Sequence, residues 1–281
     1  MNLLELDWSK VDKIIDNALL EDIGTGDVTT DTLCPGDSRS KAVIRAKAQG
    51  VIAGNPIAER VFKKLSPDAE VTVLIGDGGS VMPGDVVSRI EAPTRAILSG
   101  ERLALNILQR LSGIATETSK YVKACEGLSV KILDTRKTAP GLRLLEKYAV
   151  SAGGGRNHRM GLYDGVMIKD NHIALAGSIA RAVETVRQKY GLGMSIEVET
   201  SNLAEVREAL ESRADVIMLD NMTLEEMREA VSVINGGALT EASGGVELDT
   251  VRGIAETGVD FVSVGAITHS ARALDIALYL V

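Results

Sequence analysis

Residues 196–220 read IEVETSNLAEVREALESRADVIMLD, and this stretch decides the fold of the second half of the chain. A short apolar run at 196–198 precedes a helical pattern at 203–210, and a second apolar run follows at 216–219. Buried parallel strands have such short apolar runs, and the helix between them supplies the crossover that parallel pairing needs. The stretch therefore predicts one strand–helix–strand unit of a parallel sheet.

The same alternation continues on both sides of this unit and predicts further parallel strands with crossover helices. Further apolar runs lie at 130–133, 166–168, 238–239 and 261–264, and further helical patterns at 179–190, 224–233 and 250–255.

The first half of the chain, up to about residue 110, has a different pattern in which short strands outnumber helices. Helical patterns cover 8–20, 56–65 and 96–124, and strand-like runs cover 41–48, 51–53, 71–75 and 86–90. Gly113 interrupts the longest helical pattern, and a glycine inside a helix costs about 1 kcal/mol relative to alanine. One continuous helix over 96–124 is therefore not secure from the sequence.

The composition is that of an ordinary globular protein. The chain has 281 residues, of which 45% are hydrophobic and 25% charged, enough for one large or two modest domains. Only 3% are aromatic, so the core must be built from Ala, Val, Ile and Leu, as in parallel α/β folds. The formal net charge of −8 argues against a general nucleic-acid binder, which needs a basic surface.

The sequence predicts a cytoplasmic protein with no membrane span. Acids near the N-terminus stand where a signal peptide needs basic residues, and no uncharged stretch approaches the ~18 residues of a span. Cys34 and Cys125 lie far apart without a Cys/His cluster, which argues against a zinc site or a disulfide framework.

Charged residues or glycines follow nearly every predicted strand of the second half. In a β/α barrel the C-terminal strand ends meet at one mouth, where the active site is found. We therefore interpret these strand ends as a functional mouth. They are Asp134-Thr135-Arg136-Lys137, Lys169-Asp170, Glu199, Asp220-Asn221, Glu241-Ala242-Ser243-Gly244-Gly245 and Gly265-Ala266.

The local charge of this region is opposite to the charge of the whole chain. The window 134–172 holds seven basic and four acidic residues, so it carries +3 and leaves −11 for the rest. It also contains three consecutive glycines at 153–155, which let a backbone approach a ligand closely. The window therefore indicates an anionic ligand, although a solvated loop with surface arginines is an alternative.

Cations and carboxylates at one mouth predict a polyanionic substrate together with a metal ion. Arginine binds carboxylate or phosphate through a planar fork, whereas lysine acts as a point charge. Glu199 and Asp220, on successive strands, suit Mg²⁺, which prefers oxygen ligands and shares substrate phosphates. Glycine loops after the last two strands of a barrel commonly bind a phosphate.

Each of these features also has a structural interpretation. Glu199 and Asp220 could cap the helices that follow them. Lys169 could form a Schiff base, but the neighbouring Asp170 opposes the neutral amine that this chemistry requires. We interpret His172 as a structural hydrogen-bonding residue. No P-loop and no dinucleotide-binding glycine motif is present in the sequence.

Three segments closely resemble the quinolinate phosphoribosyltransferase family, also called nicotinate-nucleotide pyrophosphorylase (carboxylating). The resemblance extends over essentially the full length. Its main segments are Asp134-Thr135-Arg136-Lys137-Thr138, Gly153-Gly154-Gly155-Arg156-Asn157-His158-Arg159 and Lys169-Asp170-Asn171-His172. Supporting segments include Gly100-Glu101-Arg102, Glu197-Val198-Glu199, Leu219-Asp220-Asn221, Glu241-Ala242-Ser243-Gly244-Gly245 and Val264-Gly265-Ala266.

This resemblance implies an α/β fold made of two domains, the type II phosphoribosyltransferase fold. We expect an N-terminal α/β sandwich over 1–110, to which 269–281 return, and a C-terminal incomplete β/α barrel over 111–268. The family also implies a homodimer, with higher oligomers possible, in which Arg102 reaches the site of the neighbouring subunit.

The family reaction joins quinolinate to 5-phosphoribosyl 1-diphosphate, with Mg²⁺, and yields nicotinate mononucleotide, CO₂ and pyrophosphate for NAD synthesis. The resemblance implies that Lys137, Glu199 and Asp220 are catalytic and serve the ribose diphosphate. Glu199 and Asp220 would hold the metal directly or through diphosphate and water. Substrate binding would involve Arg102, Thr135, Arg136, Lys137, His158, Arg159, Lys169, Glu199 and Asp220, with Ser243, Gly244, Gly245, Val264, Gly265 and Ala266 around the 5-phosphate.

Two other functions compete with this one. A paralogue similar to molybdenum-transport-associated proteins would have a different substrate, and the complete cation cluster argues against it. A non-catalytic barrel that binds a phosphorylated metabolite would have no need of both Glu199 and Asp220 beside Lys137.

Overall fold

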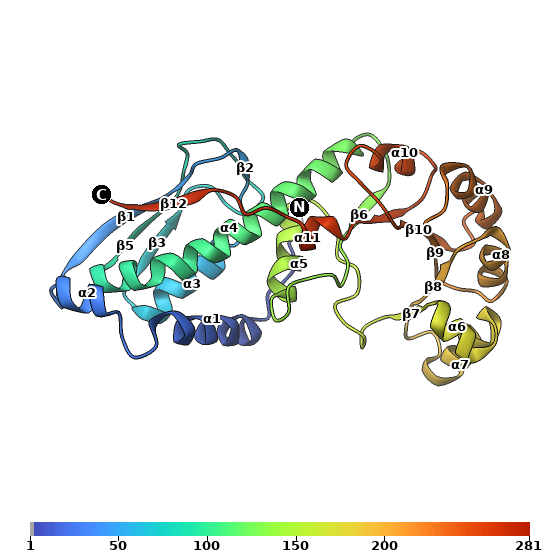
Figure 1. The fold of residues 1–281 in the computed structure, drawn as a ribbon, viewed down its shortest axis with the longest axis horizontal. Coiled ribbons are helices and arrows are strands. Elements are labelled where there is room, and N and C mark those ends of the chain that lie inside the picture. The colour runs from blue at the N-terminus through green and yellow to red at the C-terminus, as the bar shows by residue number, and fades with distance from the viewer. Residues whose placement is uncertain (1–2) are drawn as a thin grey trace. The chain divides into compact units, whose positions relative to one another are not determined.

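The computed structural model describes residues 3–281 and divides them into two compact units (Figure 1). The first unit comprises the chain up to Ser119 together with Thr138–Gly154 and Ile267–Val281. The second comprises Lys120–Lys137 and Gly155–Ala266. The domain boundaries expected from the sequence stay a prediction, whereas the predicted α/β fold with a parallel second half is confirmed.

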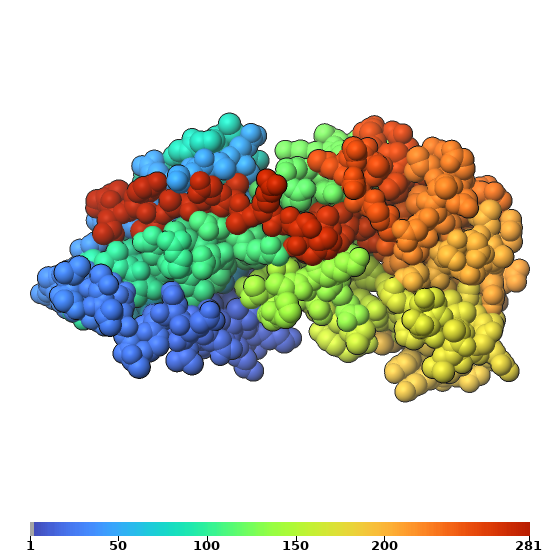
Figure 2. Space-filling model, in the orientation of Figure 1, coloured from blue at the N-terminus to red at the C-terminus, as the bar shows by residue number. Residues whose placement is uncertain are grey.

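The first unit is built on an antiparallel four-stranded sheet in the order β12-β1-β5-β3. Its strands are β1 (Arg39–Ala46), β3 (Glu70–Val73), β5 (Val86–Pro93) and β12 (Ile276–Leu280), and β2 (Gly50–Val51) pairs separately with β4 (Ser80–Val81). The C-terminal strand β12 pairs with β1 from Ala42↔Leu280 to Ala46↔Ile276. Figure 2 shows this last segment of the chain, in the deepest red, lying at the surface of the first unit.

The helices of the first half begin where a side chain or a proline supports the first turn. Asp7 accepts a hydrogen bond from the backbone of Ser9 at the start of α1, and Pro56 occupies the first turn of α3. The helices of this half and of its returning segments are α1 (Trp8–Ile23), α2 (Val28–Leu33), α3 (Asn55–Leu65), α4 (Thr94–Ala124), α5 (Arg143–Ala152) and α11 (Ala266–His269).

Helix α4 continues without a break through Gly113, because another backbone segment crosses it there. A Cβ atom at Gly113 would lie 2.1 Å from the carbonyl oxygen of Arg272 and 3.0 Å from Cα of Ala273. The crossing is fixed by the N–H of Leu274, which donates to the carbonyl of Gln109 at 2.9 Å. The glycine that weakens the helix on propensity alone is therefore needed for the returning segment to reach the sheet.

We expect Gly113→Ala to destabilise the protein by about 1–3 kcal/mol, because the added methyl forces the crossing backbone to move. Gly253→Ala in α10 is the matched control, since its nearest neighbour, Leu224 Cδ1, would lie at an ordinary 3.5 Å. There the gain in helix propensity should dominate, at up to about 1 kcal/mol of stabilisation. Urea unfolding followed by circular dichroism compares the two, and equal shifts would contradict the crossing argument.

The second unit contains a six-stranded parallel sheet in the order β6-β11-β10-β9-β8-β7, so β6 and β7 are its outermost strands. This is the incomplete β/α barrel expected from the sequence. Its strands are β6 (Lys131–Leu133), β7 (Val166–Ile168), β8 (Ile196–Thr200), β9 (Val216–Asp220), β10 (Leu239–Ser243) and β11 (Phe261–Ser263). Its helices are α6 (Asp170–Ala176), α7 (Ile179–Tyr190), α8 (Leu203–Glu211), α9 (Leu224–Ile234) and α10 (Val251–Ala255).

Small aliphatic side chains fill the interior of this sheet. Val198, Ile217, Leu219, Ala242 and Val262 are completely buried, as the scarcity of aromatic residues requires. In the described part of the chain, no helix is both long and apolar enough to cross a membrane.

Candidate active site

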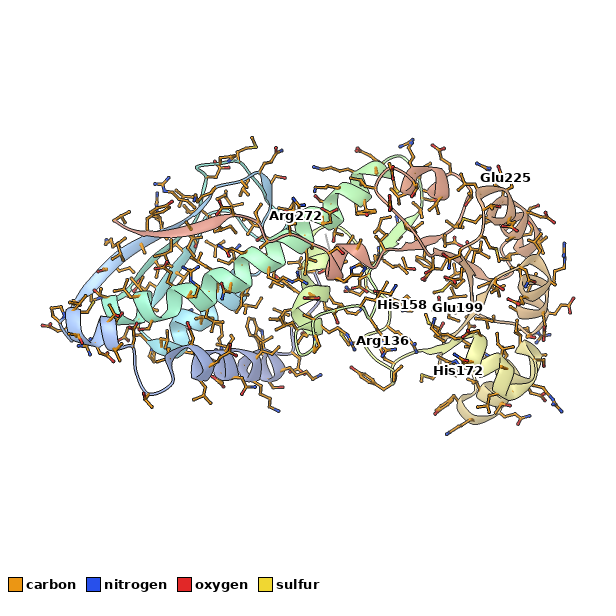
Figure 3. The ribbon with its side chains drawn as sticks, viewed as in Figure 1. Arg136, His158, His172, Glu199, Glu225 and Arg272 are labelled. Carbon is orange, nitrogen blue, oxygen red and sulfur yellow. The ribbon has the colours of Figure 1, made fainter. Side chains whose placement is uncertain are left out.

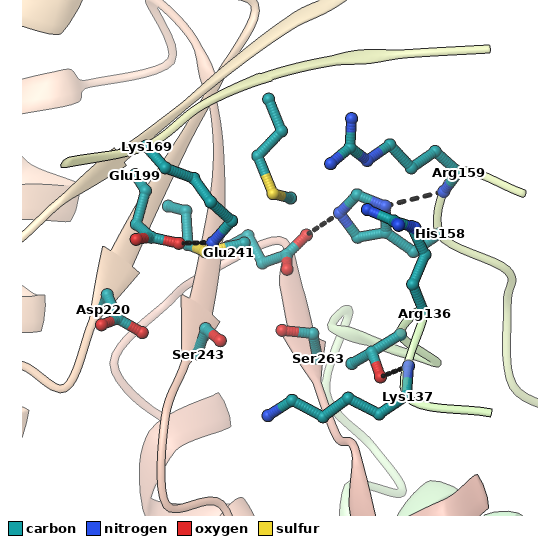
Figure 4. A pocket seen from close by; sticks show the side chains of 13 residues that line it. Arg136, Lys137, His158, Arg159, Lys169, Glu199, Asp220, Glu241, Ser243 and Ser263 are labelled. Atoms are coloured by element: carbon teal, nitrogen blue, oxygen red, sulfur yellow. Dashed lines mark hydrogen bonds and ion pairs between the residues drawn. The ribbon is translucent and has the colours of Figure 1, made fainter. Parts of the chain in front are cut away.

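A cavity of about 340 Å³ opens at the C-terminal edge of the parallel sheet (Figure 4), a volume that suits a small-molecule ligand. Each of the six strands supplies lining residues at or close to its C-terminal end. Active sites of β/α barrels are found at this end of the strands. The lining residues are Thr135, Arg136, Lys137, His158, Arg159, Met167, Lys169, Glu199, Met218, Asp220, Glu241, Ser243 and Ser263.

The cavity brings together most of the residues that the sequence placed at a functional mouth. Figure 3 shows that Arg136, His158 and Glu199 face one region of the second unit, whereas Glu225 lies on the outer helices. The predicted residues that line the cavity are Thr135, Arg136, Lys137, His158, Arg159, Lys169, Glu199, Asp220 and Ser243.

Other predicted residues do not line this cavity. Gly244 and Gly245 directly follow β10, both with positive φ, and a Cβ at Gly244 would collide with the Asn221 amide. Val264, Gly265 and Ala266 directly follow β11. Arg102 is an exposed residue of α4 in the first unit.

Lys169 and Glu199 form an ion pair across the cavity wall, Nζ to Oε2, with the carboxylate only 18% exposed. The two come from adjacent strands, because Lys169 follows β7 and Glu199 lies in β8. This pairing makes Lys169 a charged partner of an acid. It supports a role in anion binding over the alternative of a Schiff base, which needs a neutral amine.

Neither carboxylate caps the helix that follows it, so the capping interpretation was wrong. Asn202 caps α8 by accepting from the backbone N–H of Glu205, and Thr223 caps α9 by accepting from that of Glu226. Asp220 lies half-buried at the end of β9 and accepts a 2.8 Å hydrogen bond from Asn221 Nδ2. The carboxylates of Glu199 and Asp220 therefore line the cavity and do not cap helices.

His172 makes a structural hydrogen bond, as predicted from the sequence. Its Nδ1 accepts from the backbone N–H of Lys169 at 3.0 Å and thereby supports the first turn of α6. The residue does not line the cavity.

A buried aspartate positions the His158 segment. Asp134 is fully buried just after β6 and accepts hydrogen bonds from Asn157 Nδ2 at 2.6 Å and from the backbone N–H of His158 at 2.8 Å. The backbone of Arg156 also pairs with β6, because its N–H donates to the carbonyl of Ile132 at 2.8 Å. The loop after β6 and the segment 156–158 are therefore held side by side.

Both ring nitrogens of His158 are engaged by the protein itself. Nδ1 accepts from the backbone N–H of Arg159 at 2.7 Å, so we assign the proton of the ring to Nε2. Nε2 lies 2.9 Å from Glu197 Oε2 and 3.7 Å from Glu241 Oε2. In this arrangement His158 directs its N–H toward Glu197.

Glu197 and Glu241 are buried carboxylic groups at the site; in the sequence analysis both were quoted only within longer segments and neither was assigned a role. Glu197 is 6% exposed and Glu241 only 1%. Burial, and then the nearby charge of Glu197, raise the pKa of Glu241 to about 7. Strand periodicity could have found the first of them, because Glu197 and Glu199 are two residues apart in β8 and share one face.

The His158, Glu197 and Glu241 side chains also form the kind of cluster that can hold a metal, with ligand atoms within 4.8 Å of one another. Their shortest contact, 2.9 Å between His158 and Glu197, has the length of a hydrogen bond. Several cations line the same cavity. The cluster is therefore better suited to hold a proton than to hold a metal cation in addition to the cationic side chains nearby.

Two arginines on the opposite wall create a site for anions. Burial, and then the neighbouring Arg136, lower the pKa of the Arg159 guanidinium from its usual value. Arg159 Nη1 donates to the carbonyl of Gly165 at 2.8 Å, which fixes the side chain. Glu197 and Asp164 offset part of this repulsion. An anionic ligand between the two arginines would offset more of it and would be attracted here.

Glu199 and Asp220 fit a magnesium ion better than any other described pair of lining residues. Both offer carboxylate oxygens to the cavity, and Mg²⁺ is commonly held by one or two carboxylates together with substrate phosphates. The donor set contains no sulfur or imidazole, which softer metals would favour.

Comparison with known proteins gives the same result for the whole chain. The model of the quinolinate phosphoribosyl transferase N-terminal domain matches residues 27–112, and that of its C-terminal domain matches residues 114–279. The chain is 47% identical over 285 residues to the chloroplastic nicotinate-nucleotide pyrophosphorylase (carboxylating) of Arabidopsis thaliana, covering 94% of this chain and 81% of that protein. It is 45% identical to quinolinate phosphoribosyltransferase (decarboxylating) 1b of Nicotiana tabacum, covering 94% and 81%.

Solved structures agree in fold. The crystal structure of NadC from Streptococcus pyogenes superposes with a TM-score of 0.96 at 39% identity and covers 99% of both chains. The chain therefore belongs to the quinolinate phosphoribosyl transferase family, and it is a phosphoribosyltransferase.

Proposed function

We propose that this protein transfers the phosphoribosyl group of 5-phosphoribosyl 1-diphosphate to quinolinate with decarboxylation, in a Mg²⁺-dependent reaction of de novo NAD synthesis. The products are nicotinate mononucleotide, CO₂ and pyrophosphate. The observation that carries the proposal is the cavity itself, where Arg136 and Arg159 face the carboxylates Glu199 and Asp220, with Lys169 paired to Glu199. One side suits a dianion and the other a developing cation.

The cation side is suited to quinolinate. Arg136, Arg159 and Lys169 together can offset two carboxylates and hold the ring in one orientation. Thr135 and His158 line the same wall. Since both His158 nitrogens are engaged by Arg159 and Glu197, His158 would act on the substrate mainly by positioning its neighbours.

The acid side is suited to the ribose diphosphate. Loss of pyrophosphate makes the anomeric carbon cation-like, and nearby carboxylates stabilise that charge. Lys137 would offset the diphosphate. The loops Ser243-Gly244-Gly245 and Val264-Gly265-Ala266, at the ends of β10 and β11, would surround the 5-phosphate.

Glu199 and Asp220 would hold Mg²⁺ directly or through the diphosphate and water. The bound ion would neutralise charge on the departing diphosphate.

The proposal includes a cytoplasmic homodimer in which Arg102 completes the site of the neighbouring subunit. Arg102 is exposed on α4, as a residue offered to another chain must be. Nucleic acids and membranes are not proposed as partners, because the chain carries −8 overall.

We expect the purified protein to release CO₂ and nicotinate mononucleotide when given quinolinate, 5-phosphoribosyl 1-diphosphate and Mg²⁺, and to stop when the metal is chelated. Product is followed by release of labelled CO₂ and by chromatography. Nicotinate in place of quinolinate is the control substrate. No product from a folded dimer would contradict the proposal, and preferred turnover of nicotinate would assign a different transferase reaction.

A further inference from the structure

Glu241 lines the cavity but has no part in the roles described above. It lies in β10 between Met218 of β9 and Phe261 of β11, and its side chain is almost completely buried. Figure 4 shows its carboxyl group in the middle of the site, pointing toward His158. Glu241 therefore lies in the buried wall of the cavity, where it would contact a bound substrate.

The surroundings of Glu241 disfavour its charged form. Burial raises its pKa most, and two other acids, Glu197 in β8 and Asp134 after β6, raise it further. His158 and the Ser263 hydroxyl act in the opposite direction. Across the cavity the cationic groups are Arg136, Lys137, Arg159 and Lys169.

Hydrogen bonding compensates only in part for this burial, through the Ser263 hydroxyl. Among the residues that the structure describes, Glu241 Oε1 has no hydrogen-bond partner, and Oε2 lies 3.7 Å from His158 Nε2, beyond hydrogen-bond length. His158 directs its N–H to Glu197 instead. A buried carboxylate with so little support from donors is costly to ionise, which favours the protonated form of Glu241 up to near neutral pH.

The proposed reaction needs one such proton at the ring. When the bond between the ring carbon and its carboxylate breaks, CO₂ leaves and the electron pair stays on the carbon next to the positively charged ring nitrogen. The product has a C–H bond at this carbon, so a proton must be added. This inference rests on the proposed function, because only a decarboxylating reaction creates that need.

Other groups in the cavity are poorer donors for this step. The Lys169 ammonium is paired with Glu199, and the His158 N–H is directed to Glu197. The Lys137 ammonium also lines the cavity, and the proposed function assigns it to the diphosphate. Guanidinium groups are very weak acids. Glu241 is the lining acid whose proton has no other use in the described site.

We propose that Glu241 is the proton donor to the ring carbon that loses CO₂. Its O–H bond breaks, the proton forms the new C–H bond with the electron pair left by decarboxylation, and Glu241 becomes a carboxylate. A proton from solvent restores the acid after the product leaves.

Glu241→Gln tests the step because it keeps the shape of the side chain and removes the acid. We expect kcat to fall by roughly 10²-fold while calorimetry shows retained affinity for quinolinate. Glu241→Asp, which keeps an acid, should recover part of the rate. The wild-type kcat/KM, which reports the free enzyme, should fall as pH rises through about 7, and kcat should show an alkaline fall of its own.

Ser263→Ala provides a readout that a merely structural role would not move. The Ser263 hydroxyl lowers the pKa of Glu241, so its loss should shift the alkaline fall of kcat to higher pH. An unchanged profile in Ser263→Ala together with near-wild-type kcat in Glu241→Gln would overturn the proposal. A joint loss of quinolinate affinity and kcat in Glu241→Gln would also overturn it, since binding alone would then explain the effect.

A measurement without substrates separates this inference from the proposed function. A raised folded-state pKa gives stability that is present below the unfolded value and lost as pH rises through the folded value. Wild-type unfolding free energy should therefore lose, between about pH 4.5 and 7, a component that Glu241→Gln lacks. If wild type shows this component but no decarboxylation, the proposed function fails. If it decarboxylates without the component, the donor assignment fails alone.

Discussion

Arg102→Ala is expected to lower turnover by roughly 10³-fold, because the substrate would lose a charge-assisted contact needed to orient it, while the fold stays intact. Arg102 is exposed on α4, so its truncation leaves no buried group without a partner. Steady-state kinetics with quinolinate and 5-phosphoribosyl 1-diphosphate measures the loss, and thermal unfolding checks the fold. Arg228→Ala is the matched control, because Arg228 on α9 is exposed and has only a 3.9 Å ion pair with Glu225.

Complementation shows whether Arg102 acts on its own subunit or on the neighbour. Lys169→Ala removes the ammonium that pairs with Glu199 inside the cavity and should also be nearly inactive. If sites are shared, a heterodimer of the two variants contains one complete site. Random exchange at equal amounts should then restore about a quarter of wild-type activity.

The result depends on subunit exchange, so exchange must be demonstrated separately with differently tagged chains. No recovery in proven heterodimers would contradict the shared site and place Arg102 in its own subunit's cavity or outside the chemistry. A mixture of Arg102→Ala with Arg228→Ala is the reference for subunit exchange. It should be active whether or not sites are shared, because Arg228→Ala is itself active.

The parallel sheet could be predicted from sequence because its strands are buried on both faces. Runs such as 216–219 consist of apolar residues and stand out against the polar loops around them. The cavity followed from topology, since parallel strands place their C-terminal ends at one edge. Local sequence patterns were therefore sufficient to predict the parallel sheet and the residues at its strand ends.

Helix α5 could not be predicted for a physical reason. Its residues 145–152 are buried on every side, including Glu146 and Lys147, so no apolar stripe alternates with a polar face. The Gly113 crossing is a second example, since the segment that requires the glycine lies far along the chain at Arg272. Sequence periodicity detects helices that are buried on one side only. Helix α5 is buried all round, and the contact at Gly113 depends on a distant segment.

No role could be assigned to the acids around His158 from sequence, because their contacts with this histidine exist only in the folded structure. Glu197 and Glu241 lie inside or beside strand-like runs, where each reads as an isolated charge. Only the fold brings them from β8 and β10 to the same imidazole, at 2.9 Å and 3.7 Å from Nε2. Periodicity places Glu197 on the same strand face as Glu199, but the contact of Glu197 and Glu241 with one histidine leaves no periodic signal in a single sequence.

Asp134→Ala is expected to be the most damaging single change in the second unit for stability and activity together. Asp134 is fully buried, and its carboxylate accepts hydrogen bonds from Asn157 Nδ2 and the His158 backbone N–H. Loss of these charged hydrogen bonds leaves two half-buried donors without this acceptor, at a cost of about 2–4 kcal/mol in unfolding free energy. Because the same segment carries Arg159, kcat/KM should fall by roughly 10²–10³-fold as the anion site is displaced.

Asp134→Asn separates the positioning of this segment from the charge of the aspartate. An asparagine keeps one accepting oxygen for His158 but presents an amide to the Asn157 amide, so stability should be intermediate. Removing the negative charge also lowers the pKa of Glu241, because Asp134 raises it. The alkaline fall of kcat in Asp134→Asn should therefore move to lower pH, opposite to Ser263→Ala. Denaturant unfolding and kcat profiles measure both effects, and wild-type stability in Asp134→Ala would refute the positioning role.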